Sequence, residues 1–192
     1  MARLPTRTSK RLLLKLLAYR ALGRRNVRLP RDTAEHWNQR EAIQRTLSAC
    51  DAIRTDFLDR DLYRANLISW GHELEIYTNT APILNQFIYN QYCYENGKIS
   101  IKPRLGDSVI DAGGCYGDTA LYFAEAIGED GHVFSFEFMS NNLKIFGANL
   151  DLNQRLKNNI DLIQNPLWSS SNQILFIRAD SDHSGSYPAA VK

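Results

Sequence analysis

The chain has 192 residues and a net charge of +2, from 23 Lys and Arg residues and 21 Asp and Glu residues. This length fits one domain with an appendage, and a hydrophobic content of 44% is ordinary for a globular protein. The three cysteines form no CxxC pair, which argues against a zinc site and a disulfide framework. No apolar run reaches the roughly 18 residues that a membrane-spanning helix needs.

Residues 1–31 are a basic arm with ten Lys and Arg residues and no acid. The segment from Arg11 to Arg25 predicts a helix with leucines on one side and cations on the other, which is typical of binding to an anionic membrane surface. Three other interpretations stay open: a mitochondrial transit peptide, contact with nucleic acid, and a solvated terminal helix. We expect a cytoplasmic protein without a nucleic-acid partner, and peripheral attachment to a membrane is the hypothesis that the arm suggests.

Residues 32–67 are predicted to be helical. Asp32 or Thr33 can cap this segment, and its apolar positions are spaced for one buried face. We expect a helix or a helix pair that packs before the main domain. A dimerisation helix is the alternative, so the sequence leaves a homo-oligomer open.

Residues 68–105 are rich in aromatic side chains. The alternating run Leu74–Tyr77 predicts a short strand, and Pro82 is expected to begin a helix that extends to about Tyr94. Tyr92 and Tyr94 fit packing in an aromatic core, and a lid over a ligand is the alternative interpretation.

A strand, a glycine turn and a helix follow one another around Asp111. The apolar β-branched run just before Asp111 predicts a buried strand. The three glycines of residues 113–117 permit positive φ angles and let the backbone approach a ligand closely. The apolar spacing that follows predicts a helix capped by Asp118 or Thr119. This order is expected to direct free backbone N–H groups at an anionic group of a ligand.

A second strand, His132–Glu137, ends in a carboxylate 20 residues after Gly117. In a nucleotide-binding βαβ unit, an acid at this place accepts hydrogen bonds from ribose hydroxyls. The dinucleotide fingerprint G-x-G-x-x-G is incomplete here, because Asp111 takes the place of its first glycine and would repel a pyrophosphate. Asp111 therefore argues against NAD and favours a ligand with an ammonium group, such as S-adenosylmethionine (SAM).

The remaining elements continue the alternation of helices and strands. Ser140 or Asn141 is expected to cap the next helix, and residues 160–165 predict a third strand that Pro166 ends. The run Ile174–Ile177 predicts a fourth strand in an added hairpin, before a tail that is expected to be a loop.

Three runs of this sequence resemble the FkbM-type methyltransferases, a family of class I SAM-dependent methyltransferases. The runs are VIDAGGCYGDTALYFA, VFSFEFMSNNLKIFGANLDLN and IDLIQNPLWSSSNQILF, and the resemblance covers roughly Trp70 to Phe176. It implies an α/β, Rossmann-like class I fold with SAM as the cofactor. It also implies O-methylation of a sugar hydroxyl in a polysaccharide, a glycolipid or a glycosylated metabolite, so that the partner is a small-molecule or glycan acceptor.

The resemblance also implies roles for individual residues. Asp111 would face the amino end of SAM, or else only stabilise the turn, and Glu137 would bind the ribose hydroxyls. Cys115 is interpreted as packing against the strand rather than as a catalytic thiol, and no catalytic base is assigned. The four histidines are too scattered to indicate a metal. The predicted cofactor-binding residues are Asp111, Gly113, Gly114, Cys115, Tyr116, Gly117, Asp118, Thr119, Glu137, Phe138, Met139, Asn165 and Pro166.

We divide the chain into the basic arm 1–31, a helical N-terminal segment 32–100 and a SAM-binding domain 101–192. The last part supplies about three parallel strands and the added hairpin, which is only the first half of the class I fold. We therefore expect a fragment of a longer protein or a truncated form, with the sheet edge beside the first strand left unpaired. The alternative function is a non-catalytic or truncated SAM-binding or scaffolding module.

Overall fold

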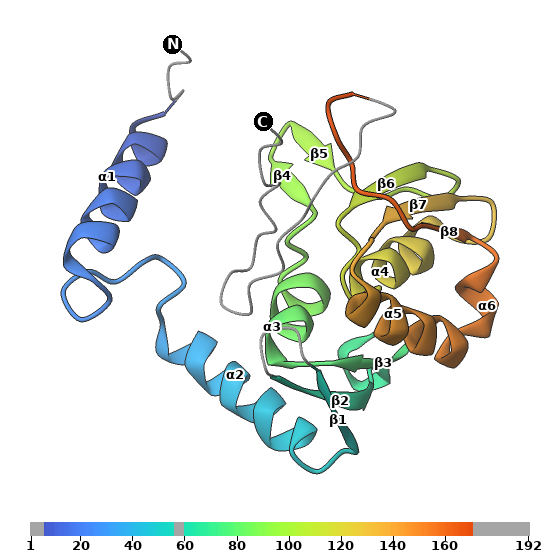
Figure 1. Ribbon diagram of the computed structural model, residues 1–192. Coiled ribbons are helices and arrows are strands. Elements are labelled where there is room, and N and C mark those ends of the chain that lie inside the picture. Colours follow the sequence, from blue (N-terminus) through green and yellow to red (C-terminus); the bar gives the residue numbers. More distant parts are fainter. Residues whose placement is uncertain (1–5, 56–59, 171–192) are drawn as a thin grey trace, which may run out of the picture. The chain divides into compact units, whose positions relative to one another are not determined.

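The structure is a computed structural model that describes residues 6–55 and 60–170 (Figure 1). The chain forms two compact units, Met1–Ala42 and Ile43–Lys192. The predicted bounds 1–31, 32–100 and 101–192 remain predictions. The predicted strand at 174–177 lies outside the described residues.

The first unit contains helix α1 (Arg7–Leu22) and the beginning of helix α2 (Ala34–Leu47). Of the two expected caps of α2, Thr33 accepts a hydrogen bond from the backbone N–H of His36 at 3.3 Å. Asp32 instead accepts the indole N–H of Trp37 at 2.6 Å.

The helical prediction for residues 32–67 is wrong beyond Leu47. Strands β1 (Ala52–Thr55) and β2 (Arg60–Asn66) follow, and β3 (Glu75–Thr78) completes an antiparallel sheet in the order β1-β2-β3. Pairing between the strands overrides the helical spacing that the apolar residues show in the sequence. The short strand expected near residues 74–77 is confirmed.

The helical segment after β3 ends at Ile88, earlier than the end at about Tyr94 that the sequence predicts. A single α-helical turn, α3 (Thr80–Pro82), is capped by Asn79 and continues as a π-helix, η3 (Ile83–Ile88). The helix ends early, and Asn90 soon follows with a left-handed φ of 46°. Tyr94 lies in a hairpin made of β4 (Tyr94–Asn96) and β5 (Ile99–Ile101).

The remainder of the second unit confirms the predicted α/β class. Strands β6 (Ser108–Ala112), β7 (His132–Phe136) and β8 (Ile160–Ile163) form a parallel sheet in the order β6-β7-β8. Parallel strands need crossover connections, which α4 (Asp118–Ile127) supplies between β6 and β7. Helices α5 (Ser140–Leu152) and α6 (Gln154–Lys157) connect β7 to β8.

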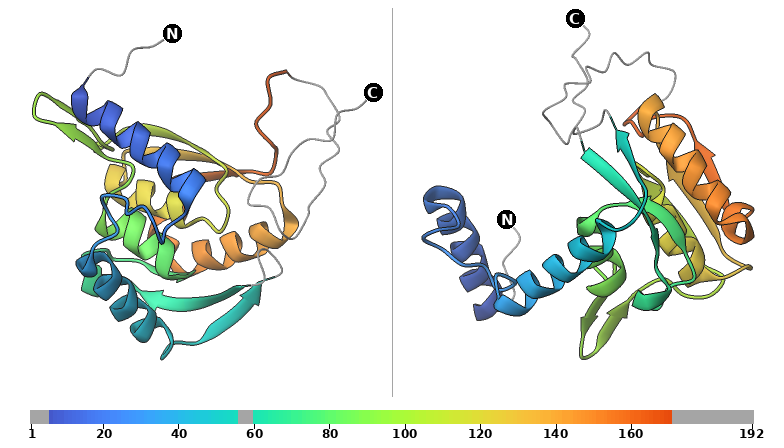
Figure 2. Two further views of the ribbon diagram at one scale, coloured as in Figure 1. Left: turned by 90° about the vertical axis from the view of Figure 1, so that its left-hand side faces the viewer. Right: turned by 90° about the horizontal axis from the view of Figure 1, so that it is seen from below.

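Two helices lie between the antiparallel sheet β1-β2-β3 and the parallel sheet of this unit (Figure 2). Helix α4 packs on the parallel sheet and on η3, and α5 packs on β3. The buried core between these layers includes Leu121, Ile127, Val133 and Phe146, none of which is exposed to solvent.

Strand β6 is less buried than the sequence predicts. Among the described strands it pairs with β7 alone, so its other edge is open, as expected. Ile110 is 71% exposed because neighbouring side chains of a strand point to opposite faces, and Asp111 takes the face covered by helices. The prediction of a strand buried on both faces is therefore wrong at Ile110.

Candidate functional site

Two carboxylates emerge at one edge of the parallel sheet. The register pairs Ala112 of β6 with Phe136 of β7, so the two strands end side by side. Asp111 near the end of β6 and Glu137 just after β7 are consequently neighbours, which fits the carboxyl-end position of ligand sites in parallel sheets.

Asp111 is buried and accepts a hydrogen bond from the Ser135 hydroxyl at 2.8 Å. Burial raises the pKa of Asp111, and the negative charge of Glu137 raises it further. Hydrogen bonds from Ser135 and Thr119 oppose this shift in the pKa. The side chain thus lies in a place where an additional positive charge would stabilise its ionised form.

The glycine turn packs closely against its surroundings. A Cβ at Gly114 would lie 2.2 Å from the Ser135 hydroxyl oxygen, and one at Gly117 would lie 2.7 Å from the ring of Phe146. Gly117 also has a φ of 82°, which other residues rarely adopt. Glycine is therefore required at both positions by the approach of β7 and α5.

The backbone N–H groups of this turn are not all free, contrary to the expectation from the sequence. Gly113 and Gly114 donate to the carbonyl oxygen of Phe136 at 3.0 and 2.9 Å, and Gly117 donates to that of Gly114 at 2.7 Å. These three N–H groups hold the turn against β7. They do not point at a ligand.

Asp118, the first residue of α4, is a third buried carboxylate. Burial is the largest cause that raises its pKa to about 6. Its Oδ2 accepts a hydrogen bond from Nε2 of Gln86 at 2.7 Å, which partly opposes the shift. Gln86 belongs to the π-helix η3, an element that is frequent at functional sites.

Glu137 is also buried, and its carboxylate is held by the start of α5. Oε1 accepts the backbone N–H groups of Phe138 and Met139, both at 2.7 Å. Oε2 accepts Nδ2 of Asn142 at 3.0 Å. A carboxylate offers about four acceptor directions. One direction therefore remains on Glu137, where the ribose role predicted from the sequence would use two hydrogen bonds.

Two buried amide oxygens beside these carboxylates have no hydrogen-bond partner among the described residues. They are Oε1 of Gln86 and Oδ1 of Asn142. In each case the amide nitrogen donates to a carboxylate, which fixes the orientation of the amide group, since a flipped amide would place two acceptor oxygens together. Both orphaned atoms are hence acceptors, and leaving them unpaired costs about 1–3 kcal/mol each.

The site contains no counter-charge within the part of the chain that the structure describes. Asp111, Asp118 and Glu137 form no ion pair there with Lys, Arg or His. Burial raises the pKa of the Cys115 thiol to about 12, and the charges of these acids add to the shift. Cys115 is therefore a neutral thiol, which fits packing and not nucleophilic catalysis.

The other predicted site residues are placed as follows. Thr119 is buried next to Asp118, and the carbonyl oxygen of Tyr116 accepts Nδ2 of Asn149 at 2.8 Å. Asn165 and Pro166 follow β8, whose end adjoins that of β7, so they lie at the same sheet edge. Asn165 is exposed.

Of the two tyrosines considered as a lid, Tyr92 packs on an aromatic group of α4. Its ring centroid lies 5.9 Å from that of Tyr122 and 5.0 Å from that of Phe123. Burial raises the pKa of Tyr92, and the charges of Asp118 and Asp111 contribute to the shift. Tyr94 is exposed in the hairpin.

Sequence reasoning missed Gln86 and Asn142. Gln86 is a polar residue between apolar neighbours in the run ILNQFI, and this contrast is the only signal that the sequence offers. Its burial is visible only in the structure. Asn142 lies five residues after Glu137, within reach at the start of a helix, but nothing in the sequence indicates that the two side chains bond.

No protein-family model matches the chain, and a search of curated proteins found no match. Among solved structures, several SAM-dependent methyltransferases are similar to parts of it. An arsenic (III) S-adenosylmethionine methyltransferase from Chlamydomonas reinhardtii is 23% identical over 40% of this chain, with a TM-score of 0.31. A SAM-dependent methyltransferase from Aquifex aeolicus is 23% identical over 38% of this chain, with a TM-score of 0.29.

A third similar structure is Aeropyrum pernix fibrillarin with natively bound S-adenosyl-L-methionine. It is 15% identical over 61% of this chain, with a TM-score of 0.31. The chain spans 27% of the Chlamydomonas protein, 36% of the Aquifex protein and 58% of the fibrillarin. At these TM-scores the likenesses are partial, so we base the function on the residues of the site.

Proposed function

We propose that this chain binds S-adenosylmethionine and is the cofactor-binding part of a methyltransferase. One observation carries the proposal: three buried carboxylates and two orphaned amide oxygens meet at one sheet edge, where no Lys, Arg or His of the described residues pairs with them. Such a site needs a ligand that brings positive charge and hydrogen-bond donors. SAM has both, because it carries a sulfonium, an ammonium and two ribose hydroxyls.

The donors of the ligand can be matched to the acceptors of the chain. The pair Gln86 and Asp118 offers an amide oxygen and a carboxylate to the ammonium of the amino-acid head. Oδ1 of Asn142 and the one unused acceptor direction of the Glu137 carboxylate are offered to the ribose hydroxyls. Asp111, next to the turn, would add negative charge facing the amino end of SAM.

The chemistry of such an enzyme divides between ligand and protein. SAM supplies a methyl group that its positive sulfur already activates. The chain supplies the position and the electrostatic environment, because a correctly held pair of reactants gains much of the rate by proximity alone. The residues described here serve the cofactor, and the acceptor would be held elsewhere.

For the acceptor we propose a sugar hydroxyl. The support is the resemblance of three sequence runs to the FkbM-type methyltransferases, and no contact in the structure bears on it. Incubation with methyl-labelled SAM and a fraction of glycolipids or polysaccharides should place alkali-stable label on the glycan. Label that mild alkali removes would indicate an ester and contradict a methylated hydroxyl.

Calorimetry of the full chain tests the cofactor. We expect SAM to bind more tightly than S-adenosylhomocysteine, which lacks the positive sulfur, and we expect no heat from NADH, whose pyrophosphate meets three acids. Binding of NADH without SAM would overturn the proposal. SAM binding without methyl transfer to any acceptor would favour a scaffolding module.

A further inference from the structure

Helix α1 is a 16-residue helix without a single buried residue. Its exposed leucines include Leu12, Leu13, Leu16 and Leu17, which are 40%, 44%, 42% and 57% exposed. An isolated helix of this length is marginal in water, since most helical stability comes from packing of an apolar face. The helix therefore needs a surface against which its leucines can pack.

The leucines and the cations follow different lines along α1. Leu12 and Leu16, like Leu13 and Leu17, are four residues apart and form adjoining lines on one side of the helix. Arg7, Arg11 and Lys15 have the same spacing and form a line on the opposite side. Lys10 and Arg20 lie on the leucine side, and Leu14 and Leu22 lie in the basic sector. The long stems of Lys10 and Arg20 let their charges reach past the leucines.

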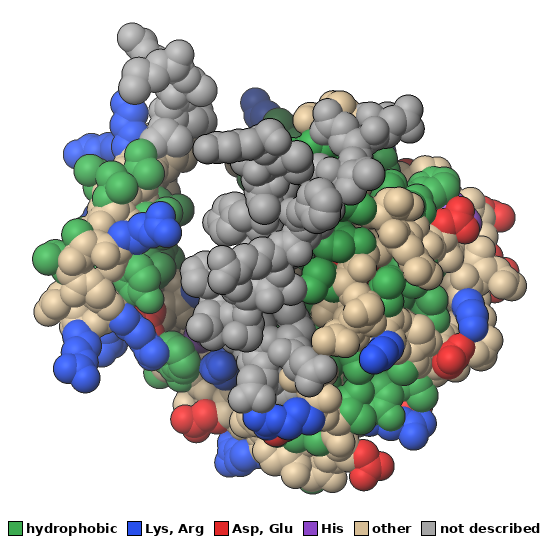
Figure 3. Space-filling view, viewed as in Figure 1, with side chains coloured by type: hydrophobic (Ala, Val, Ile, Leu, Met, Phe, Trp, Pro, Cys, Tyr) green, Lys and Arg blue, Asp and Glu red, His purple; other side chains and the backbone are tan. Residues whose placement is uncertain are grey.

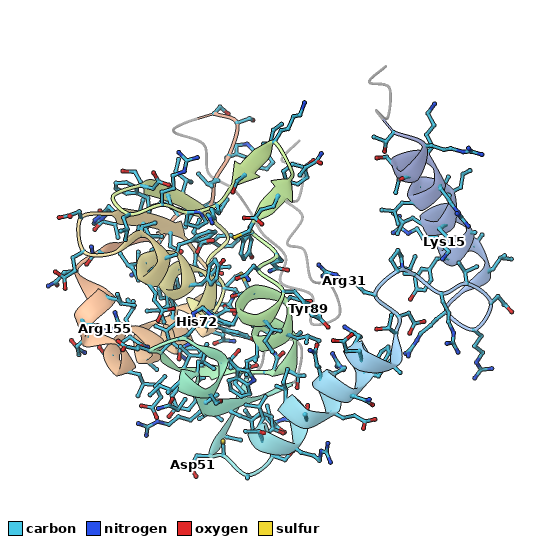
Figure 4. The ribbon with its side chains drawn as sticks, turned by 180° about the vertical axis from the view of Figure 1, so that it is seen from behind. Lys15, Arg31, Asp51, His72, Tyr89 and Arg155 are labelled. Carbon is cyan, nitrogen blue, oxygen red and sulfur yellow. The ribbon has the colours of Figure 1, made fainter. Side chains whose placement is uncertain are left out.

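The charge of α1 has one sign. The helix contains five cations and no acid, and within the described residues none of its cations forms an ion pair. Figure 3 shows both Lys or Arg side chains and hydrophobic side chains on the surface of this helix, and Figure 4 labels Lys15 on it. A partner that satisfies both groups must combine an apolar layer with anionic groups above it.

We propose that α1 binds the surface of an anionic lipid bilayer, with the leucines at the acyl boundary and the cations at the phosphates. Phosphate groups of nucleic acid would satisfy the cations but leave the leucines in water, so the leucines favour lipid. The helices in the described part are too short and too polar to cross a bilayer, so the proposal concerns attachment to its surface. It goes beyond the proposed function and does not depend on SAM.

Flotation with vesicles tests this proposal on the full chain. We expect the chain to float with vesicles that contain phosphatidylglycerol and not with phosphatidylcholine alone, and to be released by high salt. Replacement of two cations, Arg11→Gln with Lys15→Gln, should weaken binding about 30-fold, because each cation near an anionic surface contributes about one kcal/mol. Replacement of Leu13 and Leu17 by Gln should weaken binding to a similar extent.

A matched control makes the same change of charge on α2, with Arg40→Gln and Arg45→Gln, both exposed. The control should bind vesicles like the unchanged chain. Circular dichroism of the unchanged chain should show a gain of helix when vesicles are added. The α1 variants should not show this gain. Equal loss in the control, absence of flotation, or tighter binding to RNA than to vesicles would overturn the proposal.

Discussion

Asn149 bonds both backbone groups of Tyr77: its Oδ1 accepts the N–H at 2.7 Å and its Nδ2 donates to the carbonyl oxygen at 3.2 Å. One turn later, Asn153 bonds both backbone groups of Glu75, at 3.2 and 2.7 Å. Asn149 of α5 and Asn153, the residue that caps the end of this helix, thus complete the hydrogen bonding of strand β3, where a further strand would otherwise be needed. They connect the antiparallel sheet to the helix that begins at the proposed site.

Asn149→Ala should destabilise the second unit by about 2–5 kcal/mol. The change leaves the two Tyr77 groups and the Tyr116 carbonyl without this partner, and because these groups are only partly buried, each costs toward the lower end of the roughly 1–3 kcal/mol of a buried unpaired group. Urea unfolding measures the loss. Asn38→Ala, at an exposed position of α2, is the control and should change stability by less than about 0.5 kcal/mol.

Gln86→Met should lower the affinity for ligands that carry an amino-acid head. S-adenosylhomocysteine and 5′-methylthioadenosine differ in this head, so calorimetry with both isolates its contribution. We expect the first to bind about ten- to hundredfold more weakly, as for a lost hydrogen bond to a charged group, and the second to be unaffected. An equal loss for both ligands would give Gln86 a structural role only. No binding of either ligand by the unchanged chain would instead contradict the proposed cofactor.

Glu137→Gln should weaken SAM binding by about tenfold or more and leave the fold intact. The amide oxygen can still accept the N–H groups of Phe138 and Met139, and the Asn142 amide can turn to accept from the new nitrogen. What is lost is a charge and both acceptors for ribose, because the turned Asn142 uses its Oδ1 for the new nitrogen, and this is a loss of at least roughly 1.5–3 kcal/mol. Calorimetry and a thermal melt measure the two effects separately. Unchanged affinity would refute the ribose role.

The affinity for SAM should fall as the pH drops below about 6. Burial holds the pKa of Asp118 at about 6 in the free protein, so below that value the carboxyl carries a proton. A cation favours the ionised form, and the proton must therefore leave before the ligand binds. Affinity should fall by about tenfold per pH unit there. Asp118→Asn should bind more weakly at pH 7 and show a flatter profile; an unchanged profile would exclude Asp118 as the titrating group.

The second unit should be more stable at pH 6 than at pH 8 because of His72 (Figure 4). Its Nδ1 lies 2.5 Å from Oε2 of Glu125, and this hydrogen bond is the main cause that raises the pKa of His72. A raised pKa stabilises the folded state fully below the unfolded value near 6.5, and the gain disappears as the pH rises through the folded value. Urea unfolding at both pH values should show the difference, and Glu125→Gln should reduce it.

Local sequence patterns determined the parallel half of this fold. A glycine turn, a helical spacing and an acid at a strand end are written in neighbouring residues, so Asp111, the turn at 113–117 and Glu137 could be placed at one sheet edge. Such patterns report on backbone preferences within one segment. They carry no information about which distant groups meet.

The tertiary structure alone decided the chemistry of the site. Gln86 reaches Asp118 across 32 residues of sequence, and this bond leaves the amide oxygen of Gln86 as an acceptor without a donor. The N–H groups of Gly113 and Gly114 are likewise decided by the fold, because β7 packs beside the turn and its Phe136 carbonyl oxygen accepts both. Hydrogen bonding of buried groups depends on what the fold places beside them, and the sequence determines this only through the complete packing of the chain.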